Sequence, residues 1–310
     1  MKAVRYHSYG DSGVLVHEDT EQPGAGAGQV VVKVAATSFN PVDVAIRAGF
    51  LQQVFPLTFP HVPGIDVAGT VEQVGADVTG WEIGDKVVAF LPMNADGAAA
   101  EYVTVLADVL AVAPRTVDLA YAAALPAVGL TAWQALFEHA DLASGQSVLV
   151  NGAGGAVGGY AVQLAVRAGA QVTATASARS ADRVRSYGAG RVVDYIATAL
   201  TQAVAGERFD VVLNLVATSP EETFALAGLV ADGGVFVSTT TPGPDDPARG
   251  VRAAHVFVRS DATQLTDLVA LVDAGTLRID VAGQRPLADL AAVHDEAAAG
   301  RLPGKTVLIP

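Results

Sequence analysis

The 310-residue chain contains no cysteine and few charged residues, and each absence narrows the classes of protein to which it can belong. Without cysteine it has no disulfide, no thiolate nucleophile and no thiolate ligand for a metal ion. Charged residues make up only 16% of the chain, and 32 acidic residues outnumber 19 basic ones, which gives a net charge of −13. This acidity argues against nucleic acid or an anionic membrane as a partner.

Long apolar runs and targeting signals are missing as well. No stretch has the length and apolarity of a membrane-spanning helix, and the first residues, MKAVRY, read as a strand with charges in it rather than as a signal peptide. We therefore expect the cytoplasm as the location. With 51% hydrophobic residues the chain can build packed cores, and its length favours two domains over one.

Glycine clusters in one stretch, residues 148–159, which carries the strongest functional signal. It reads VLVNGAGGAVGG: an apolar strand pattern runs into the glycines, and a helix pattern of small residues follows. This order can bind a dinucleotide pyrophosphate, because glycine permits close backbone approach and the first helical amides have no acceptors within the helix. Ala153 takes the first glycine position of the usual fingerprint, whereas Gly155 and Gly158 keep the other two.

The surroundings of the glycine stretch favour cofactor binding over a purely structural turn. A strand pattern at 171–176 follows at the spacing of a strand–helix–strand unit. Further strands are expected at 191–195, 210–216 and 234–238, and such apolar runs are typical of a parallel sheet covered on both faces. We predict a doubly wound Rossmann domain of the α/β class. The turn residues expected to contact the cofactor are Gly152, Gly154, Gly155, Ala156, Val157 and Gly158.

The end of the second strand indicates which nicotinamide cofactor is bound. An NAD enzyme needs an acidic side chain there to accept hydrogen bonds from the ribose 2′-hydroxyl, but no carboxylate appears before Asp182. Ser177 and Arg179 can instead bind the 2′-phosphate of NADPH, and Arg183, one helical turn further, can assist. The alternative is a helix N-cap at Ser180 followed by solvated arginines. The sequence thus predicts NADPH.

The segments on either side of this region have a different pattern. Short strands separated by glycine and proline suggest a compact β-barrel-like domain, with strands expected at 30–36, 69–74, 86–90 and 100–105. Helical sequence begins at Asp118, breaks at Pro126 and resumes from Ala127 to His139. After a proline-rich loop we expect a strand near 255–258, a helix at 261–274 and a last strand at 305–309.

Several motifs, in order along essentially the whole chain, resemble the medium-chain dehydrogenase/reductase superfamily. HVPGIDVAGTV at 61–71, Gly75 and GDKV at 84–87 resemble the superfamily as a whole. Four further motifs resemble its zinc-independent quinone oxidoreductase branch: SFNPVD at 38–43, LP at 125–126, GLTA at 129–132 and GRLPGKTVL at 300–308. The resemblance implies a GroES-like domain built from both chain ends, a Rossmann domain between them, an active site in the cleft, and a homodimer. We therefore expect a GroES-like first part at 1–120, an NADPH-binding domain at 121–255 and a return segment at 256–310.

The resemblance also bears on metal binding. Zinc-dependent relatives carry a cysteine where this chain has Asn40, and a His–Glu pair where it has Ile65 and Asp66. The ligand types that zinc prefers are therefore missing at these positions, and we expect no metal site. His61, a lone histidine before a Pro-Gly turn, is interpreted as a loop or packing residue.

By the same resemblance, Asn40 and Asp43 are the candidate catalytic residues, and Asn40 is also expected to contact the cofactor. The alternatives are a turn at Asn40 and a helix cap at Asp43. Relatives that reduce quinones often carry a tyrosine where this chain has Ala45, so no proton donor is evident. Further cofactor contacts, with core packing as the alternative for the apolar ones, are expected at Thr131, Tyr195, Asn214, Val216, Ser238, Phe257 and Val258.

Together these features predict an NADPH-dependent, zinc-free oxidoreductase that transfers hydride to a quinone or another conjugated carbonyl compound. Such an acceptor needs no metal, because conjugation spreads the developing charge onto an oxygen that hydrogen bonds or water can stabilise. One alternative is an enoyl reductase acting on α,β-unsaturated thioesters or ketones. Another, from a different class, is an NADPH-binding redox sensor or structural protein without turnover.

Overall fold

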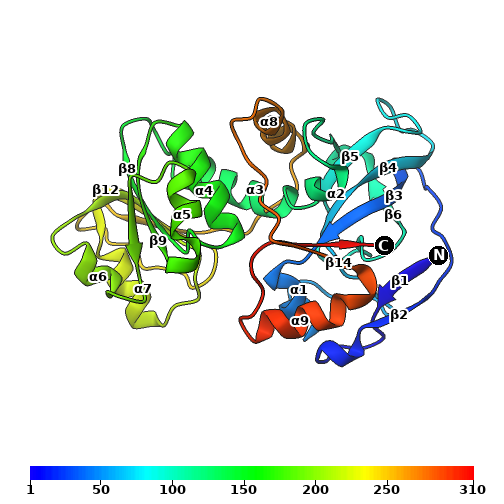
Figure 1. The fold of residues 1–310 in the computed structure, drawn as a ribbon, viewed down its shortest axis with the longest axis horizontal. Coiled ribbons are helices and arrows are strands. Elements are labelled where there is room, and N and C mark those ends of the chain that lie inside the picture. The colour runs from blue at the N-terminus through cyan, green and yellow to red at the C-terminus, as the bar shows by residue number, and fades with distance from the viewer. The chain divides into compact units, whose positions relative to one another are not determined.

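The computed structural model describes all residues from Met1 to Pro310 and divides into two compact units (Figure 1). Unit 1 comprises Met1–Ala127 and Ser260–Pro310, and unit 2 comprises Val128–Arg259. Unit 2 is thus inserted between two segments that fold together. No helix in either unit is both long and apolar enough to cross a membrane.

Unit 2 contains a six-stranded sheet in the order β10-β9-β8-β11-β12-β13, and every neighbouring pair is parallel. Read in chain order this is the 3-2-1-4-5-6 arrangement of a doubly wound Rossmann sheet. The strands are β8 (Ser147–Asn151), β9 (Gln171–Ala176), β10 (Arg191–Asp194), β11 (Phe209–Asn214), β12 (Val230–Ser238) and β13 (Arg252–His255). Leu149, Val212 and Phe236 are fully buried between the sheet and its helices. The predicted fold class is confirmed.

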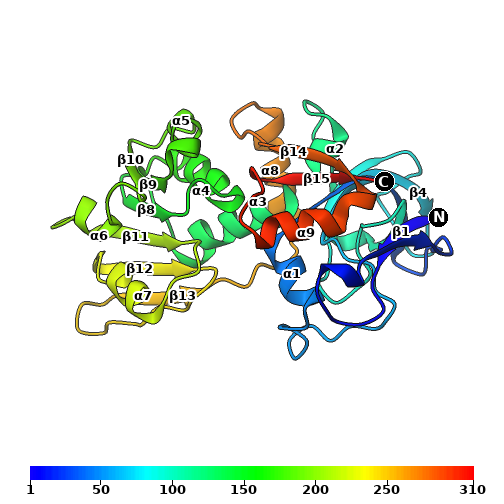
Figure 2. The same ribbon diagram turned by 60° about the horizontal axis from the view of Figure 1, so that its bottom comes forward.

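The helices of unit 2 connect these strands (Figure 2). They are α4 (Ala156–Arg167), α5 (Ala178–Ser186), α6 (Leu200–Ala203) and α7 (Pro220–Ala227). Helix α4 packs against β8 and β9, α5 against β9 and β10, and α7 against β12. Ahead of the sheet, α3 (Pro126–Trp133) continues as a π-helical segment over Gln134–His139. Helix α3 begins at Pro126 itself, because a proline without an N–H is well suited to the first helical turn.

Three local predictions in unit 2 are wrong. Helix α5 begins at Ala178 with Ser177 as its N-cap residue, so Ser180 lies inside the helix. Strand β11 ends at Asn214, which leaves Val216 in the following turn. The strand expected near 255–258 instead ends at His255, because its ladder with β12 pairs His255 with Ser238, the last residue of β12.

Unit 1 contains a seven-stranded sheet in the order β14-β15-β3-β4-β5-β7, with β6 paired to β3 beside this path. Its strands are β3 (Gln29–Ser38), β4 (Asp66–Val74), β5 (Lys86–Phe90), β6 (Tyr102–Leu106), β7 (Ala111–Val112), β14 (Gly283–Pro286) and β15 (Thr306–Ile309). A separate hairpin pairs β1 (Lys2–Arg5) with β2 (Val16–Asp19). Strand β15 joins β3 antiparallel at Val307–Ser38, so the end of the chain completes the sheet that its beginning starts. The pairing does not run around a closed ring, and a full barrel stays a prediction.

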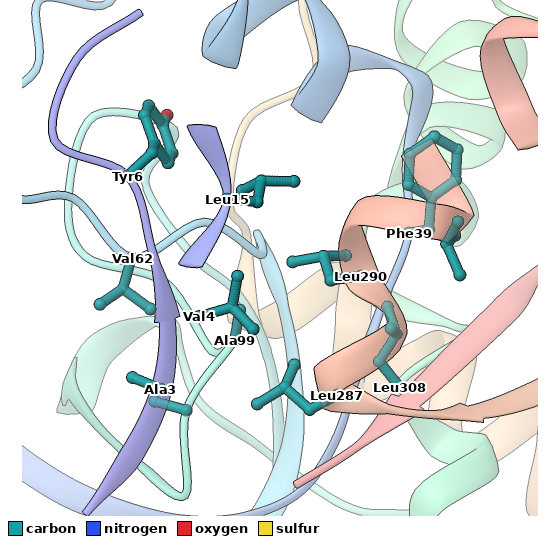
Figure 3. Close-up of a cluster of buried hydrophobic side chains, with 12 residues drawn as sticks. Ala3, Val4, Tyr6, Leu15, Phe39, Val62, Ala99, Leu287, Leu290 and Leu308 are labelled. Atoms are coloured by element: carbon teal, nitrogen blue, oxygen red, sulfur yellow. The ribbon is translucent and has the colours of Figure 1, made fainter. Parts of the chain in front are cut away.

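Four helices and an apolar cluster complete unit 1. The helices are α1 (Pro41–Arg47), α2 (Leu119–Ala122), α8 (Ala262–Asp273) and α9 (Leu290–Ala298). Figure 3 shows the cluster, in which Val4 of β1, Leu290 of α9 and Leu308 of β15 converge with side chains from intervening loops. Tyr6 belongs to the same cluster and lies at one side of it (Figure 3). The cluster therefore packs β1 against α9 and β15.

Candidate cofactor and active site

The turn between β8 and α4 can only be built with glycine at two positions. Gly152 has φ of +96°, a conformation that glycine adopts without strain. A Cβ on Gly158 would lie 2.3 Å from the carbonyl oxygen of Gly152 and 2.5 Å from the Cα of Ala153. Glycine at 158 therefore lets the first turn of α4 pass directly over the loop.

The residues of this turn fit a dinucleotide. The amides of Ala156, Val157 and Gly158 are in the first turn of α4, where they have no acceptor within the helix. Gly155 is the N-cap residue, and no side chain caps the helix in their place. Gly155 is exposed, and Ala156 and Val157 are partly exposed. Unpaired amides and the positive end of the helix dipole at one accessible loop suit a pyrophosphate.

Side chains from neighbouring strands and helices hold the glycine turn in place. The guanidinium of Arg183 donates a 2.7 Å hydrogen bond to the carbonyl oxygen of Gly154. Thr175 accepts a 2.8 Å hydrogen bond from the amide of Gly152 and donates one of 3.0 Å to Asn151. Arg183 is thus an anchor of the loop in this structure rather than a ligand for a 2′-phosphate. Sequence reasoning missed Thr175, whose only signal is a hydroxyl in the buried end of a strand.

The end of β9 leaves one arginine without a partner. Arg179 is exposed on the first turn of α5 and makes no hydrogen bond or ion pair. Ser177 is partly exposed, and its side chain does not cap the helix. The nearby carboxylate of Asp182 pairs instead with Arg185 at 2.7 Å. A hydroxyl and an unpaired guanidinium are therefore available at the position where the ribose of a bound dinucleotide is expected.

The carboxyl ends of the central strands lie in register, at Asn151, Asn214 and Ser238. The buried amide of Asn214 accepts a 2.9 Å hydrogen bond from Asn151 and donates one of 3.0 Å to the carbonyl oxygen of Val216. Ser238, also buried, accepts a hydrogen bond of 3.2 Å from the amide of Thr240. These two side chains shape the turns after their strands, and direct cofactor contact by them stays a prediction.

The remaining predicted cofactor residues fall into two groups. Tyr195 and Val216 are exposed in the segments that follow β10 and β11. Phe257 is exposed after β13, with its ring edge-on to His255 at 4.6 Å, and Val258 beside it is half-buried. Thr131 differs from these, because it is buried within α3. The exposed group has the accessibility that a ligand contact requires.

In unit 1, Asn40 lies in a buried polar network. Its amide nitrogen donates to Asp66 Oδ2 at 2.8 Å, and its side-chain oxygen accepts from Lys305 Nζ at 2.7 Å. Lys305 lies 3.3 Å from the same carboxylate oxygen. Both ends of the Asn40 amide are therefore engaged, and only 4% of the residue is exposed. The amide thus links Asp66 to Lys305, and its contact with a cofactor or substrate stays a prediction.

Asp66 is the centre of this network, and neither it nor Lys305 was singled out as a functional residue. Asp66 is fully buried and accepts further hydrogen bonds from Ser38 at 2.5 Å and from the amide of Ala127 at 2.7 Å. Burial holds the pKa of Lys305 below its usual range, while the charge of Asp66 acts in the opposite direction. The sequence indicates them only by position: Asp66 is the first residue of the apolar strand β4, and Lys305 directly precedes the apolar strand β15.

Asp43 occupies the third position of α1 and is almost completely buried. Its carboxylate accepts a 2.8 Å hydrogen bond from the backbone amide of Asn40. Burial raises the pKa of Asp43 to about 7, although the Asn40 amide and the Lys305 charge lower it. The helix-cap interpretation is thus present in the structure, and it coexists with a carboxyl that can hold or release a proton at neutral pH.

The structure contains no group of three or more histidine or acidic side chains arranged to hold a metal ion. His61 is buried, with its ring edge-on to that of Tyr6 at 5.2 Å. Its Nδ1 lies 3.5 Å from the carboxylate of Asp96.

Comparison with known proteins agrees with this arrangement. Residues 26–115 match the alcohol dehydrogenase GroES-like domain, and residues 187–308 match the family described as zinc-binding dehydrogenase. The chain is 35% identical over 329 residues to the chloroplast envelope quinone oxidoreductase homolog of Arabidopsis thaliana, covering 100% of this chain and 98% of that one. It belongs to the quinone oxidoreductase branch of the medium-chain dehydrogenase/reductase superfamily.

Two further members of this superfamily support the assignment. The quinone oxidoreductase of Coxiella burnetii has a structure with a TM-score of 0.89 at 28% identity, over 100% of this chain and 99% of that chain. The NADPH-dependent alkenal/one oxidoreductase of Arabidopsis thaliana chloroplasts is 33% identical over 100% of this chain and 80% of its own length. Dehydrogenases of this superfamily bind nicotinamide cofactors, which is consistent with the uncapped amides at the glycine turn of unit 2.

Proposed function

We propose that this protein is an NADPH-dependent, zinc-free reductase that transfers hydride to a quinone or another conjugated carbonyl compound. The observation that carries the proposal is the glycine turn before α4, whose uncapped amides are accessible in a chain of the quinone oxidoreductase branch. NADPH, when bound there, supplies the hydride. The amides of Ala156, Val157 and Gly158 bind its pyrophosphate, and Arg183 and Thr175 keep the turn rigid.

The choice of NADPH over NADH rests on the end of β9. Ser177 and Arg179 provide a hydrogen-bond donor and an unpaired positive charge for the 2′-phosphate, and the first carboxylate after them in the chain, Asp182, pairs with Arg185. The chloroplast relative with NADPH in its name supports the same choice. The names of the relatives mention quinones and alkenals or alkenones, and we propose a small conjugated acceptor of this kind for this chain. The homodimer and the cytoplasmic location stay predictions.

Zinc independence rests on the chemistry of the side chains available. The positions at which zinc-dependent relatives carry a cysteine and a His–Glu pair hold Asn40, Ile65 and Asp66 here. The ammonium of Lys305 already binds Asn40 and Asp66. A divalent cation at this point would face that ammonium in a buried setting. We therefore expect the acceptor's developing charge to be stabilised by hydrogen bonds and protons rather than by a metal.

The proposal is tested by following NADPH oxidation with quinones, enones and enoyl thioesters. We expect oxidation with a quinone or an enone, and a strong preference for enoyl thioesters would favour the enoyl-reductase alternative. Arg179→Ala should weaken NADPH binding roughly tenfold and spare NADH, because one charge-assisted bond to phosphate contributes about 1.5–3 kcal/mol. Arg208→Ala is the control, because this exposed arginine directly precedes β11 and so lies at the opposite end of the parallel strands from Arg179. Tight NADPH binding without turnover on any acceptor would instead support the sensor alternative.

A further inference from the structure

A small cavity lies beside α1 in unit 1 and is lined by three titratable side chains. Its volume is about 10 Å³, and Tyr6, Asp43 and His61 line it together with apolar and loop residues. One water needs about this volume and two to four polar partners. The polar side chains that line it can supply the partners, since neither the Tyr6 hydroxyl nor the second carboxyl oxygen of Asp43 makes a hydrogen bond within the protein.

The same cavity adjoins a larger surface hollow. The hollow has a volume of about 320 Å³ and is lined by Asp96, and it shares Val62, Ala95 and Gly97 with the small cavity. The side chain of Asp96 is 67% exposed and lies 3.5 Å from Nδ1 of His61. His61 therefore stands between an exposed carboxylate on one side and the cavity of Asp43 on the other.

We propose that Asp96, His61 and a water in this cavity form a proton-supply route to Asp43, and that Asp43 is the acid that protonates the reduced substrate. The inference rests on the proposed function, for which the sequence offered no proton donor. His61 is a positioning and relay residue in this scheme, because it acts on the substrate only through Asp43.

Protons and electrons balance along this route. When a conjugated carbonyl compound accepts hydride at its β-carbon, the C=C electron pair moves toward the carbonyl oxygen and an enolate forms. The O–H bond of the Asp43 carboxyl breaks, and its proton forms the new bond at that oxygen or at the α-carbon. The Asp43 carboxylate then takes a proton from the water, the water takes one from His61, and solvent at Asp96 replaces it. Each turnover consumes one hydride and one proton.

The charges around the route are consistent with this direction of transfer. The pKa of Asp43, about 7, leaves the carboxyl partly protonated at neutral pH. The charge of Lys305 lowers this pKa, and the charge of Asp66 raises it. Burial lowers the pKa of His61, so its ring is neutral and can accept a proton at one nitrogen while releasing one at the other. Tyr6 is held protonated, since burial and Asp43 both raise its pKa against the smaller effect of Arg47, with Tyr9 and Asp96 also facing it.

The first experiment reads the protonation of Asp43 without any cofactor. Infrared spectra of the isolated enzyme should show the carbonyl stretch of a protonated carboxyl that disappears as the pH rises through about 7. The band should be missing from Asp43→Asn. A carboxyl that is already ionised at pH 5 would overturn the proposal, whether or not the protein reduces quinones.

The second experiment separates relay from packing at His61. His61→Phe keeps the edge-on ring contact with Tyr6, and His61→Ala removes it, whereas the backbone bridge between residues 6 and 61 survives in both. We expect both variants to lose kcat by roughly tenfold or more at unchanged KM, since a positioned proton-transfer group contributes about 10²–10⁴-fold. Added imidazole should restore His61→Ala but not His61→Phe. Full activity of His61→Phe would show that the ring serves packing alone.

The outer end of the route is tested with Asp96→Asn and a matched control. Asn keeps an oxygen for the 2.9 Å hydrogen bond that Asp96 accepts from the Val62 amide but removes the charge. Asp85→Asn does the same to a surface carboxylate that accepts from the Glu82 amide and does not line the cavity. Only Asp96→Asn should increase the solvent deuterium isotope effect on kcat. If the unmodified enzyme reduces quinones and neither the His61 variants nor Asp96→Asn change kcat, the route is wrong and the proposed function stands.

Discussion

The ammonium of Lys305 donates a 2.7 Å hydrogen bond to the side-chain oxygen of Asn40, although 265 positions separate the two residues in the chain. Both lie in the interior of unit 1, where Asp66 accepts from each of them. A buried charge pair of this kind is costly to desolvate and becomes more costly when one partner is lost. The contact therefore ties the C-terminal strand to the segment that starts α1.

Removal of the Lys305 charge should destabilise the protein strongly. We expect Lys305→Met to lower the free energy of unfolding by about 3–5 kcal/mol in urea, because Asp66 would stay buried without its counterion. Lys2→Met, which breaks an exposed pair with Asp19, should cost at most about 1 kcal/mol. Adding Asp66→Asn to Lys305→Met should cost less than the sum of the two single changes. Strict additivity would mean that the two charges do not interact.

Arg183 and Arg179 should affect the cofactors differently, although they lie on the same helix. Loss of the Arg183 bond to the Gly154 carbonyl loosens the pyrophosphate turn, which NADPH and NADH share. We expect Arg183→Met to weaken both cofactors about fivefold, the equivalent of one hydrogen bond of ~1 kcal/mol. Calorimetric titration with each cofactor measures this. A selective loss of NADPH in Arg183→Met would restore Arg183 as a phosphate ligand.

A methyl group on Gly158 should disrupt the turn. The added Cβ would lie within 2.5 Å of backbone atoms that cannot move independently. Overpacking of this kind costs about 1–3 kcal/mol, so we expect Gly158→Ala to lower the melting temperature and to abolish detectable cofactor binding. Gly190→Ala is the control, because its Cβ would meet nothing nearer than 3.7 Å. Unchanged cofactor binding in Gly158→Ala would contradict the close passage of α4 over the loop.

His294 should make stability depend on pH. Burial, together with the charge of Arg47, lowers the pKa of His294 to about 3, and neither ring nitrogen has a hydrogen-bond partner. An unfolded histidine has a pKa of about 6.5, so below that value the unfolded chain binds a proton that the folded chain does not. Stability should therefore fall as the pH drops from about 6.5 toward 3, by up to about 1.4 kcal/mol per pH unit.

The contribution of His294 can be isolated by substitution. His294→Phe keeps a ring against Phe39, which lies edge-on at 5.0 Å, and removes the proton-binding site. Urea midpoints at pH 7 and pH 5 should differ less in this variant than in the unmodified protein. His17→Phe, at an exposed histidine, should leave the difference as it was. Equal pH dependence in the unmodified protein and His294→Phe would assign the effect to other groups.

The sequence by itself determined the local elements and the order in which they alternate. The predicted strand at 86–90 has the same first and last residues as β5. The strand, glycine turn and helix predicted around 148–159 also lie where the structure has them. These features depend on neighbours in the chain: side-chain periodicity, the conformational freedom of glycine, and the lack of acceptors at a helix start. The missing cysteines likewise constrained the chemistry without any knowledge of the fold.

Only the tertiary structure decided what the polar side chains at these elements contact. Asn40 meets Lys305, Arg183 meets the Gly154 carbonyl, and Asp43 shares a cavity with His61, each across a long stretch of chain. The sequence shows that such groups can form hydrogen bonds, but many partners of equal chemistry are available along it. Burial makes the choice, because a polar group removed from water must be satisfied by whichever partner the packed core brings within reach.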